Sequence, residues 1–394
     1  MAVTEWTLSW FDSEAHIAQE LWEVCFPPPL EGQWWYRSLE QAGLEDQFRF
    51  MYAVVQWLGQ PVAIAPVFIM DVPLSILAPP WVDSIINRCK SLFPSLPFQR
   101  TLFVGSPCSD EGHVGIKPGV DQRFVFHTLQ QALPRRARQF KASLLTWKDF
   151  PRRDDILFHE LVRTYRLFAL VSFPGTVCPL AGGSKEGYLA TLKGSRRHNL
   201  RKKWRRSAEK VTLEVTVIQN PDMKTIDSIF CLFSKTYDKS TTKFERLNRR
   251  FFERIAQEPC VYFIVLRMPN QGEMVAFMLC FTFSGMMINK FIGIDYQRPA
   301  EWLLYFRLWE AAVEWALSRG MGSIQSGQTG YGAKILTGHR LQPLTNYCLH
   351  LNPLLHRVFS KIARSVSWRT IDDDLGNYLR LYSEMKLTQG TIET

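Results

Sequence analysis

The sequence lacks several features that would place the protein in a membrane, an export route or a metal-dependent class. None of its 394 residues belongs to an apolar run approaching the ~18 residues of a spanning helix. Residues 1–10 contain Glu5 but no basic segment, which argues against a secretory signal. The eight cysteines form neither a CxxC pair nor a zinc-type Cys/His cluster, which excludes a structural metal or a disulfide framework. We expect a cytoplasmic protein with buried, reduced thiols.

Motifs for covalent catalysis are also missing. The chain has no Gly-x-Ser-x-Gly elbow, because Phe283-Ser284-Gly285 reads as the tip of a hairpin. Cys348 and His350 are the nearest thiol–imidazole pair, and alternation along a strand would place both on one side. A cysteine nucleophile is therefore kept as a minor alternative.

The composition is that of a folded protein: 46% of the residues are hydrophobic, with 13 Trp and 27 Phe. At roughly 100–200 residues per domain, this length predicts two or three domains. The net charge is +10, and most of it is local. Residues 193–210 hold nine Lys or Arg and one acid, a net charge of +8. The rest of the chain is nearly neutral.

Most of that basic segment lies in a helix predicted over residues 186–208, which has Leu189, Leu192, Leu200 and Trp204 as its apolar stripe. Three interpretations of its outer face are open: a site for a phosphate-bearing donor, contact with a membrane surface or anionic lipid intermediate, and a solvated face without a ligand. The residues expected to bind phosphate are Arg196, Arg197, Arg201, Lys202 and Arg205.

A faint repeat relates the two halves of the chain. Each half has a strand, a turn with Gly and Pro and a second strand, followed later by a helix and one more strand. In the second half a third strand, residues 286–294, precedes the helix. The other segments are 52–58, 62–69, 125–140 and 143–147 in the first half, and 261–266, 274–281, 304–318 and 323–325 in the second. The pattern predicts a duplicated, mixed α/β architecture.

Three local features carry further expectations. Pro134 lies inside the first repeat's helix and predicts a kink or a break there. Residues 186–208 are expected to form one helix, and Asn220 is expected to cap a helix that has Pro221 as its first residue. Residues 72–97 form an apolar, Pro-containing excursion that would make a wall of an acceptor pocket or a contact surface.

Four segments together resemble a known family: residues 188–203, the meander 274–296, the helix 303–320, and Gly327-Gln-Thr-Gly-Tyr-Gly-Ala-Lys334, which runs on to Arg340 and Pro343. In this order they resemble GNAT-type acyltransferases related to the Fem aminoacyl transferases, often labelled peptidoglycan-biosynthesis or BioF2-like acetyltransferases. Residues 34–43 resemble the N-terminal part of the same group. The resemblance covers most of the chain.

The resemblance implies two tandem GNAT-like domains, for which we predict the ranges 1–160 and 161–394, the latter with a C-terminal helical extension. It also implies transfer of an acyl or aminoacyl group to an amine. Fem-type relatives take the group from a charged tRNA, whereas ordinary GNAT enzymes use acyl-CoA. The chain lacks a Gln/Arg-x-x-Gly-x-Gly/Ala phosphate loop in register, and it has Gln325 where relatives often carry an acid.

Amide formation needs a neutral amine, a stabilised oxyanion and a proton for the leaving group. The residues predicted to supply this chemistry are Asp295, Tyr305, Tyr331 and Lys334. Gln328 and Arg340 are further predicted donor-binding residues in and after the glycine-rich loop, whose close backbone approach to a ligand glycine permits.

The sequence therefore predicts an acyltransferase that uses aminoacyl-tRNA, slightly preferred, or acyl-CoA as co-substrate, with no bound cofactor or metal. The acceptor is expected to be an amine-bearing small molecule or peptide. The alternative is a non-catalytic protein of the same fold that recognises tRNA, another nucleic acid or an anionic envelope component.

Overall fold

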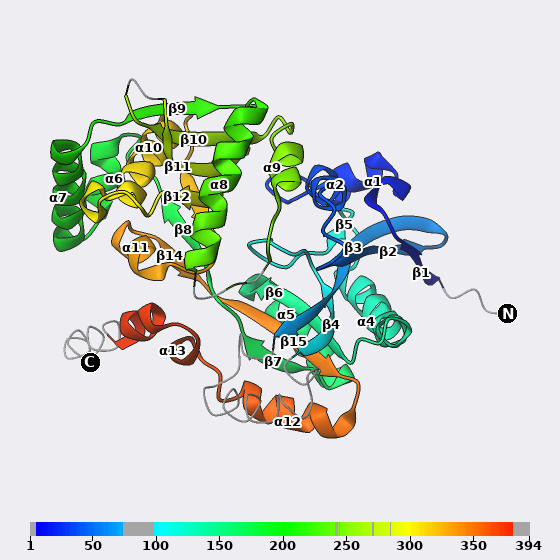
Figure 1. Ribbon diagram of the computed structural model, residues 1–394. Helices are drawn as coiled ribbons and strands as arrows, with labels where there is room; N and C mark the ends of the chain where they lie inside the picture. The colour runs from blue at the N-terminus through cyan, green and yellow to red at the C-terminus, as the bar shows by residue number, and fades with distance from the viewer. Residues whose placement is uncertain are drawn as a thin grey trace, which may run out of the picture.

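The computed structural model describes residues 5–73, 98–240, 243, 245–269, 272–283 and 285–380. Their strands form two mixed sheets placed next to each other, with helices packed on the sheet faces (Figure 1). The predicted mixed α/β architecture is confirmed. The apolar excursion predicted at 72–97 lies outside the described residues from position 74 onward.

The first sheet is built mainly from the N-terminal half of the chain. Its neighbouring strands pair antiparallel except β4 and β6, which are parallel, and β5 pairs with β3 at the side of the sheet. In pairing order the strands are β1 (Trp6–Phe11), β2 (Arg49–Trp57), β3 (Gln60–Pro73), β4 (Phe98–Val104), β6 (Leu144–Pro151), β15 (Leu344–His350) and β7 (Phe168–Val171), with β5 at Gly115–Ile116.

The second sheet has the same plan. Its strands pair antiparallel except β12 and β13, which are parallel. In the corresponding order the strands are β9 (Glu214–Ile218), β10 (Val261–Arg267), β11 (Met274–Phe283), β12 (Met286–Ile294), β13 (Ser323–Ser326), β8 (Gly175–Pro179) and β14 (Arg340–Gln342). The predicted repeat is therefore present strand for strand.

The sheets exchange chain segments at their sixth strands. β15 comes from near the C-terminus but pairs with β6 and β7 in the first sheet. β8 follows β7 directly in sequence, yet it pairs with β13 and β14 in the second sheet. Both β7 and β15 come from residues 161–394, so the first sheet crosses the predicted division at residue 160, which stays a prediction.

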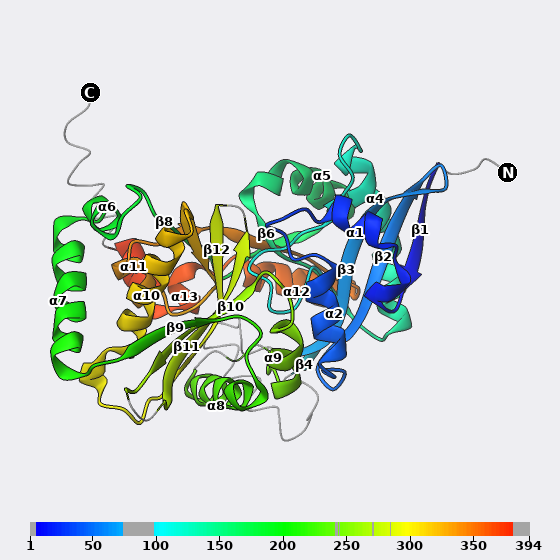
Figure 2. The same cartoon turned by 90° about the horizontal axis from the view of Figure 1, so that it is seen from above.

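Helices cover the sheets on both sides (Figure 2). On β10, Phe263 packs in the cluster of Ile226 from α8, and the next residue, Ile264, packs in the cluster of Leu308 from α10. Alternation along the strand therefore sends neighbouring side chains to two separate cores. The helices are α1 (Gln19–Cys25), α2 (Gln33–Gln41), α4 (Gln122–Gln139), α5 (Asp155–Tyr165), α6 (Lys185–Thr191), α7 (Gly194–Lys210), α8 (Met223–Lys239), α9 (Arg249–Ile255), α10 (Leu304–Ser318), α11 (Tyr331–Leu336), α12 (Pro353–Ala363) and α13 (Trp368–Ile371).

The structure corrects three local predictions. The single helix expected at 186–208 is two helices, α6 and α7, because Leu192 is extended where its side chain packs beside Gly338. Asn220 has a φ of 48° and lies before the cap, and Asp222 caps α8 by accepting from the Thr225 N–H at 2.8 Å. Of the kink or break predicted at Pro134, the break is absent: the helix α4 continues through Pro134, and its buried stripe packs on the first sheet.

An aromatic cluster joins the two halves. The Trp35 ring of α2 lies 5.8 Å from the Phe251 ring of α9 and 5.7 Å from the Phe281 ring of β11, centroid to centroid. All three rings are buried in one hydrophobic core that also includes residues of α1 and α8. This continuous core fixes the halves relative to each other. Within the described ranges, no helix combines the length and apolarity needed to cross a bilayer.

Candidate functional site

A central cavity of about 390 Å³ lies between the two sheets. Its walls come from both halves, and the second half contributes the middle of β12 and the loop that follows the parallel strand β13. The polar groups in its lining are Cys108, Ser109, Asp110, Lys148, Asp149, Ser172, Thr236, Tyr237, Ser240, Glu245, Asn289, Lys290, Tyr305, Gln328, Thr329, Lys334 and Asn346. Polar groups converging among phenylalanines in a cavity this size are typical of a ligand site.

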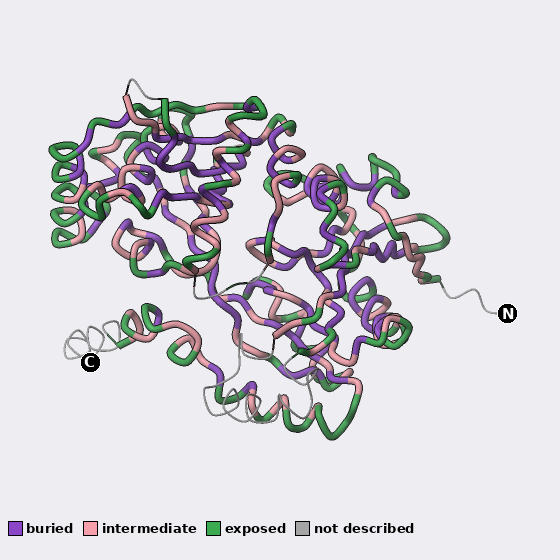
Figure 3. Tube along the Cα trace, in the orientation of Figure 1, coloured by how far each residue is buried: buried purple, intermediate pink, exposed green. Residues whose placement is uncertain are grey.

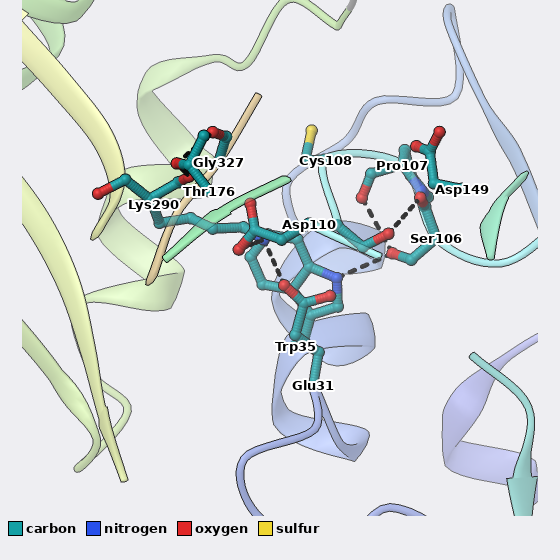
Figure 4. Close-up of polar contacts among 12 residues, drawn as sticks. Glu31, Trp35, Ser106, Pro107, Cys108, Asp110, Asp149, Thr176, Lys290 and Gly327 are labelled. Atoms are coloured by element: carbon teal, nitrogen blue, oxygen red, sulfur yellow. Dashed lines mark hydrogen bonds and ion pairs between the residues drawn. The ribbon is translucent and has the colours of Figure 1, made fainter. Parts of the chain in front are cut away.

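Lys290 forms a buried ion cluster across the two halves (Figure 4). Its side chain is 1% exposed, and its Nζ contacts a Glu31 carboxylate oxygen and lies 3.3 Å from Asp110 Oδ2. The ammonium also lies 4.8 Å from the centroid of the Trp35 ring. Burial raises the pKa of Glu31 to about 7, with Lys290 opposing this shift and Asp110 adding to it. Lys290 thereby anchors Asp110 at the edge of the central cavity.

A second ion pair lies on the opposite wall. Lys148 Nζ donates to Asp149 Oδ2 at 2.5 Å, and the other Asp149 oxygen accepts from the Ser172 hydroxyl. Asp149 adopts a φ of 59°, a left-handed conformation that costs a non-glycine residue free energy, and Asn346 Oδ1 holds it by accepting from its N–H at 2.7 Å. Asn346 lies on β15, so the exchanged strand shapes this wall.

Lys334 differs from the other two lysines of the cavity. Its Nζ donates to the backbone carbonyls of Gly327 at 2.5 Å and Gln328 at 3.2 Å, and it pairs with no carboxylate among the described residues. Burial lowers the pKa of Lys334 to about 8, and the Asp110 carboxylate opposes that shift. Since an ammonium has three N–H donors, one remains after the two carbonyl bonds. Lys334 is thus a cavity cation whose pKa of about 8 lies well below that of an ordinary lysine.

The loop carrying Asp110 is held by close backbone packing. A Cβ at Gly327 would lie 2.8 Å from Asp110 Oδ1, so glycine lets the carboxylate approach the backbone there. Trp35 Nε1 donates to Ser106 Oγ at 2.9 Å, and Ser109 Oγ donates to the Ser106 carbonyl at 3.0 Å. The Gly112 N–H donates to the Asp149 carbonyl at 2.7 Å. These bonds fix Asp110 between the two halves.

Replacing Gly112 by alanine is expected to destabilise the protein by about 2–3 kcal/mol, the upper part of the range for overpacking. The new Cβ would lie 2.0 Å from the Lys148 carbonyl oxygen and 2.7 Å from Phe150 Cδ2, and the backbone has little freedom to move away. Denaturant unfolding measures the change. Gly194→Ala is the control, because a Cβ there meets nothing within 4 Å; an equal loss in both variants would contradict the steric argument.

The predicted catalytic residues occupy three kinds of environment. Lys334 and Tyr305 line the central cavity, and burial raises the pKa of the Tyr305 hydroxyl, which stays protonated. Tyr331 is fully buried and donates to the Pro174 carbonyl at 2.9 Å. Asp295 lies outside the cavity lining, paired with Lys235 at 3.1 Å and Arg298 at 3.0 Å. Burial opposes ionisation of Asp295, but hydrogen bonds from Lys235, the Gln297 N–H and Arg298 lower its pKa overall.

The predicted donor-binding residues are also divided. Gln328 lines the central cavity and donates to the Phe173 carbonyl at 3.0 Å. The helix α7 buries Leu200 and Trp204 against the second half and turns its charges outward (Figure 3). Four of the predicted residues on α7 do not line the central cavity: Arg197, Arg201, Lys202 and Arg205. Arg196 and Arg340 line a second cavity.

The alternative of a cysteine nucleophile finds no support in the geometry. Cys348 Sγ accepts from Thr146 Oγ1 at 3.5 Å, and burial raises the pKa of its thiol to about 12. His350 Nδ1 accepts from the Asn352 N–H at 3.1 Å instead of contacting the thiol. Cys108 does line the central cavity, but burial and the nearby Glu245 raise the pKa of its thiol well above the usual range.

The sequence reading missed the carboxylates and the buried lysine of the cavity. Asp110 and Glu31 lie in loops far apart in sequence, and no local pattern connects them. Lys290 did give a signal, because a lone lysine inside the apolar strand 286–294 needs a buried partner. Asp149 gave none, since its left-handed backbone is set by contacts with β15.

Comparisons with known proteins bear on the family and the fold of the chain. Residues 181–367 match the model of the FemAB_like family, described as peptidoglycan biosynthesis/recognition. The structure of FemX superposes with a TM-score of 0.55 at 11% identity, covering 89% of this chain and 100% of FemX. A tandem GNAT protein from the clavulanic acid biosynthesis pathway gives 0.51 at 9% identity, covering 89% of this chain and 99% of that one. No curated protein matches the chain in sequence.

These comparisons confirm both the predicted resemblance and the predicted fold. FemX and the tandem GNAT protein share the fold over nearly their whole lengths, and the family match covers the part of the chain that contains β12, α10 and the glycine-rich loop. The chain thus resembles the FemAB_like family over residues 181–367 and has the fold of two tandem GNAT-like domains.

Proposed function

We propose that the protein is an acyltransferase that forms an amide bond in the central cavity, between an amine acceptor and a donor that is aminoacyl-tRNA in preference to acyl-CoA. The observation that supports this most directly is that a carboxylate and a lysine ammonium line the same cavity. Asp110 offers a carboxylate from the first half, and Lys334 offers a cation with a pKa of about 8 from the second.

Asp110 is proposed to receive the proton that the acceptor amine loses as its nitrogen attacks. A carboxylate also attracts an amine entering the cavity, which orients the nucleophile before the bond forms. Asp110 can do both because Lys290 fixes its position through Oδ2 while the residue lines the cavity.

Lys334 is proposed to act on the donor. Its free N–H and positive charge stabilise the oxyanion that forms when the amine attacks the acyl carbonyl. The new C–N bond replaces the ester or thioester bond, and the leaving oxygen or sulfur takes a proton from Lys334. A pKa of about 8 suits this role, because the group is protonated at neutral pH yet releases its proton readily.

Two features favour the tRNA donor. The chain lacks the phosphate loop that acyl-CoA enzymes of this fold carry, and its resemblance is to the Fem type, whose members use charged tRNA. The central cavity, about 390 Å³, has room for an acyl group and an acceptor amine but not for a polynucleotide. The family description supports an amine-bearing peptide as the acceptor.

Supplying labelled aminoacyl-tRNA and labelled acyl-CoA separately, each with a panel of amines and amine-bearing peptides, tests the proposal. We expect the label to move from aminoacyl-tRNA into an amide. Transfer from acyl-CoA alone would contradict the donor assignment, and discharge of neither donor would favour the non-catalytic alternative.

The proposed role of Lys334 predicts the alkaline side of the pH profile. The active form of Lys334 is protonated, so kcat/KM is expected to fall about tenfold per pH unit above a pH of about 8. Steady-state rates between pH 6 and 10 measure this decline. Lys334→Met should be slow and lack this decline, whereas an unchanged decline in the variant would assign it to another group.

A further inference from the structure

A second cavity, of about 610 Å³, is lined by the end of the glycine-rich segment 327–340. The first part of this segment and Lys334 line the central cavity, whereas Gly338, His339 and Arg340 line the second. We call it the arginine cavity, after the Arg152, Arg196 and Arg340 side chains in its lining. These come from the turn after β6, the first turn of α7 and the start of β14.

The charge of this cavity is of one sign. Among the described residues that line it there is no aspartate or glutamate, and Arg152, Arg196 and Arg340 form no ion pair within the described part of the chain. His339 is neutral, because burial and the charge of Lys334 lower its pKa to about 3. Arginines converging from three separate elements without a counter-charge leave a strong positive field in a concave site.

We propose that the arginine cavity binds the phosphate groups of an adenine nucleotide, the chemistry shared by the 3′ end of tRNA and by CoA; this rests on the proposed function, for which it would be the donor anchor. Guanidinium groups bind phosphate oxygens through paired N–H bonds, which suits the three arginines to phosphate, and Lys193 adds a fourth basic side chain to the lining. Trp368 and Tyr378 add aromatic side chains to the lining, suited to a base.

The cavity lining connects this anchor to the proposed chemistry. His339 Nε2 lies 3.0 Å from Ser326 Oγ, and its Nδ1 lies 3.0 Å from the Lys334 carbonyl oxygen. Ser326 directly precedes Gly327, whose carbonyl accepts from Lys334 Nζ. A donor held by its phosphates in the arginine cavity therefore lies along the segment that positions Lys334. The outer face of α7 has no such connection.

The test is binding by the full-length protein without acceptor, using inorganic pyrophosphate, CoA and a CCA-ending RNA minihelix as probes in calorimetry. Arg196→Gln and Arg340→Gln are each expected to weaken pyrophosphate binding roughly 10- to 100-fold, the range for charge-assisted hydrogen bonds. Arg201→Gln/Arg205→Gln on the outer face of α7 is the matched control and should leave pyrophosphate affinity unchanged. Unfolding temperatures verify that all variants are folded.

The RNA and CoA measurements also distinguish the source of the nucleotide. Weaker RNA binding in the cavity variants assigns the site to the tRNA end, and weaker CoA binding assigns it to CoA. Pyrophosphate binding that is absent in the wild type, or that depends only on Arg201 and Arg205, overturns the proposal. If binding depends on the cavity arginines but no acyl group is transferred, the binding site is supported and the proposed function is contradicted. If an acyl group is transferred but binding does not depend on these arginines, the proposed function is supported and the binding site is contradicted.

Discussion

Asp110→Asn is expected to reduce kcat/KM for amide formation by about 10²- to 10⁴-fold, the range for loss of a general base. The amide has the size of the carboxylate but cannot accept the proton of the attacking amine. Lys290 keeps its contact with Glu31, so the fold should persist. Steady-state kinetics measure the loss, with whichever of aminoacyl-tRNA and acyl-CoA the wild-type protein uses as its donor. Thermal unfolding verifies the fold.

The pH profile separates a chemical role of Asp110 from a structural one. The Asp110 carboxylate raises the pKa of Lys334, against the effect of burial, so removing its charge should lower that pKa further. The alkaline decline of the residual activity should therefore move to a lower pH than in the wild type. Asp71→Asn, which removes an exposed partner of Arg100, is the control and should change neither rate nor profile. A full rate in Asp110→Asn would exclude the base assignment.

The fold was largely predictable because its signals are local. Alternation and Gly/Pro turns located β2, β3, β10 and β11, and the third strand matches β12 in both bounds. The exchange of β8 and β15 between the sheets was not predictable, since strand partners far apart in sequence depend on tertiary packing. That exchange places Asn346 beside Asp149 and so decides the shape of the cavity wall.

The candidate site was predictable only where a motif spans it. The glycine-rich segment led to Lys334, which lines the central cavity. Asp295 was favoured because it is an acid at the end of a strand, but its two basic neighbours make it part of an ion-pair network. Asp110, which lines the same cavity as Lys334, comes from the other half of the chain, so its place in the sequence gives no indication that the two residues share a site. Net charge was likewise ambiguous, because most of the basic helix faces outward, whereas Lys193 and Arg196 at its start line the arginine cavity.

Lys290→Met is expected to destabilise the protein by about 3–5 kcal/mol, the cost of leaving buried charges without their partner. Glu31 and Asp110 would face each other with side chains 13% and 10% exposed and no cation between them. Denaturant unfolding gives the free energy. Lys185→Met is a close control, because Lys185 also contacts two carboxylates and lies 4.8 Å from a tryptophan ring centroid, but it is 26% exposed. That variant should lose at most about 1 kcal/mol.

The loss in Lys290→Met should depend on pH in a direction set by Glu31. Its folded pKa of about 7 lies above the ordinary 4.5, so the folded state binds more protons and stability falls as the pH rises between these values. Removing Lys290 raises the folded pKa further, which extends that fall to higher pH. The variant should therefore be closest to the wild type at pH 5 and furthest from it at pH 8, and Glu31→Gln in the same chain should restore part of the difference. A loss that is equal at both pH values and unaffected by Glu31→Gln would mean that Lys290 contributes through packing, and Asp110 would then need another anchor.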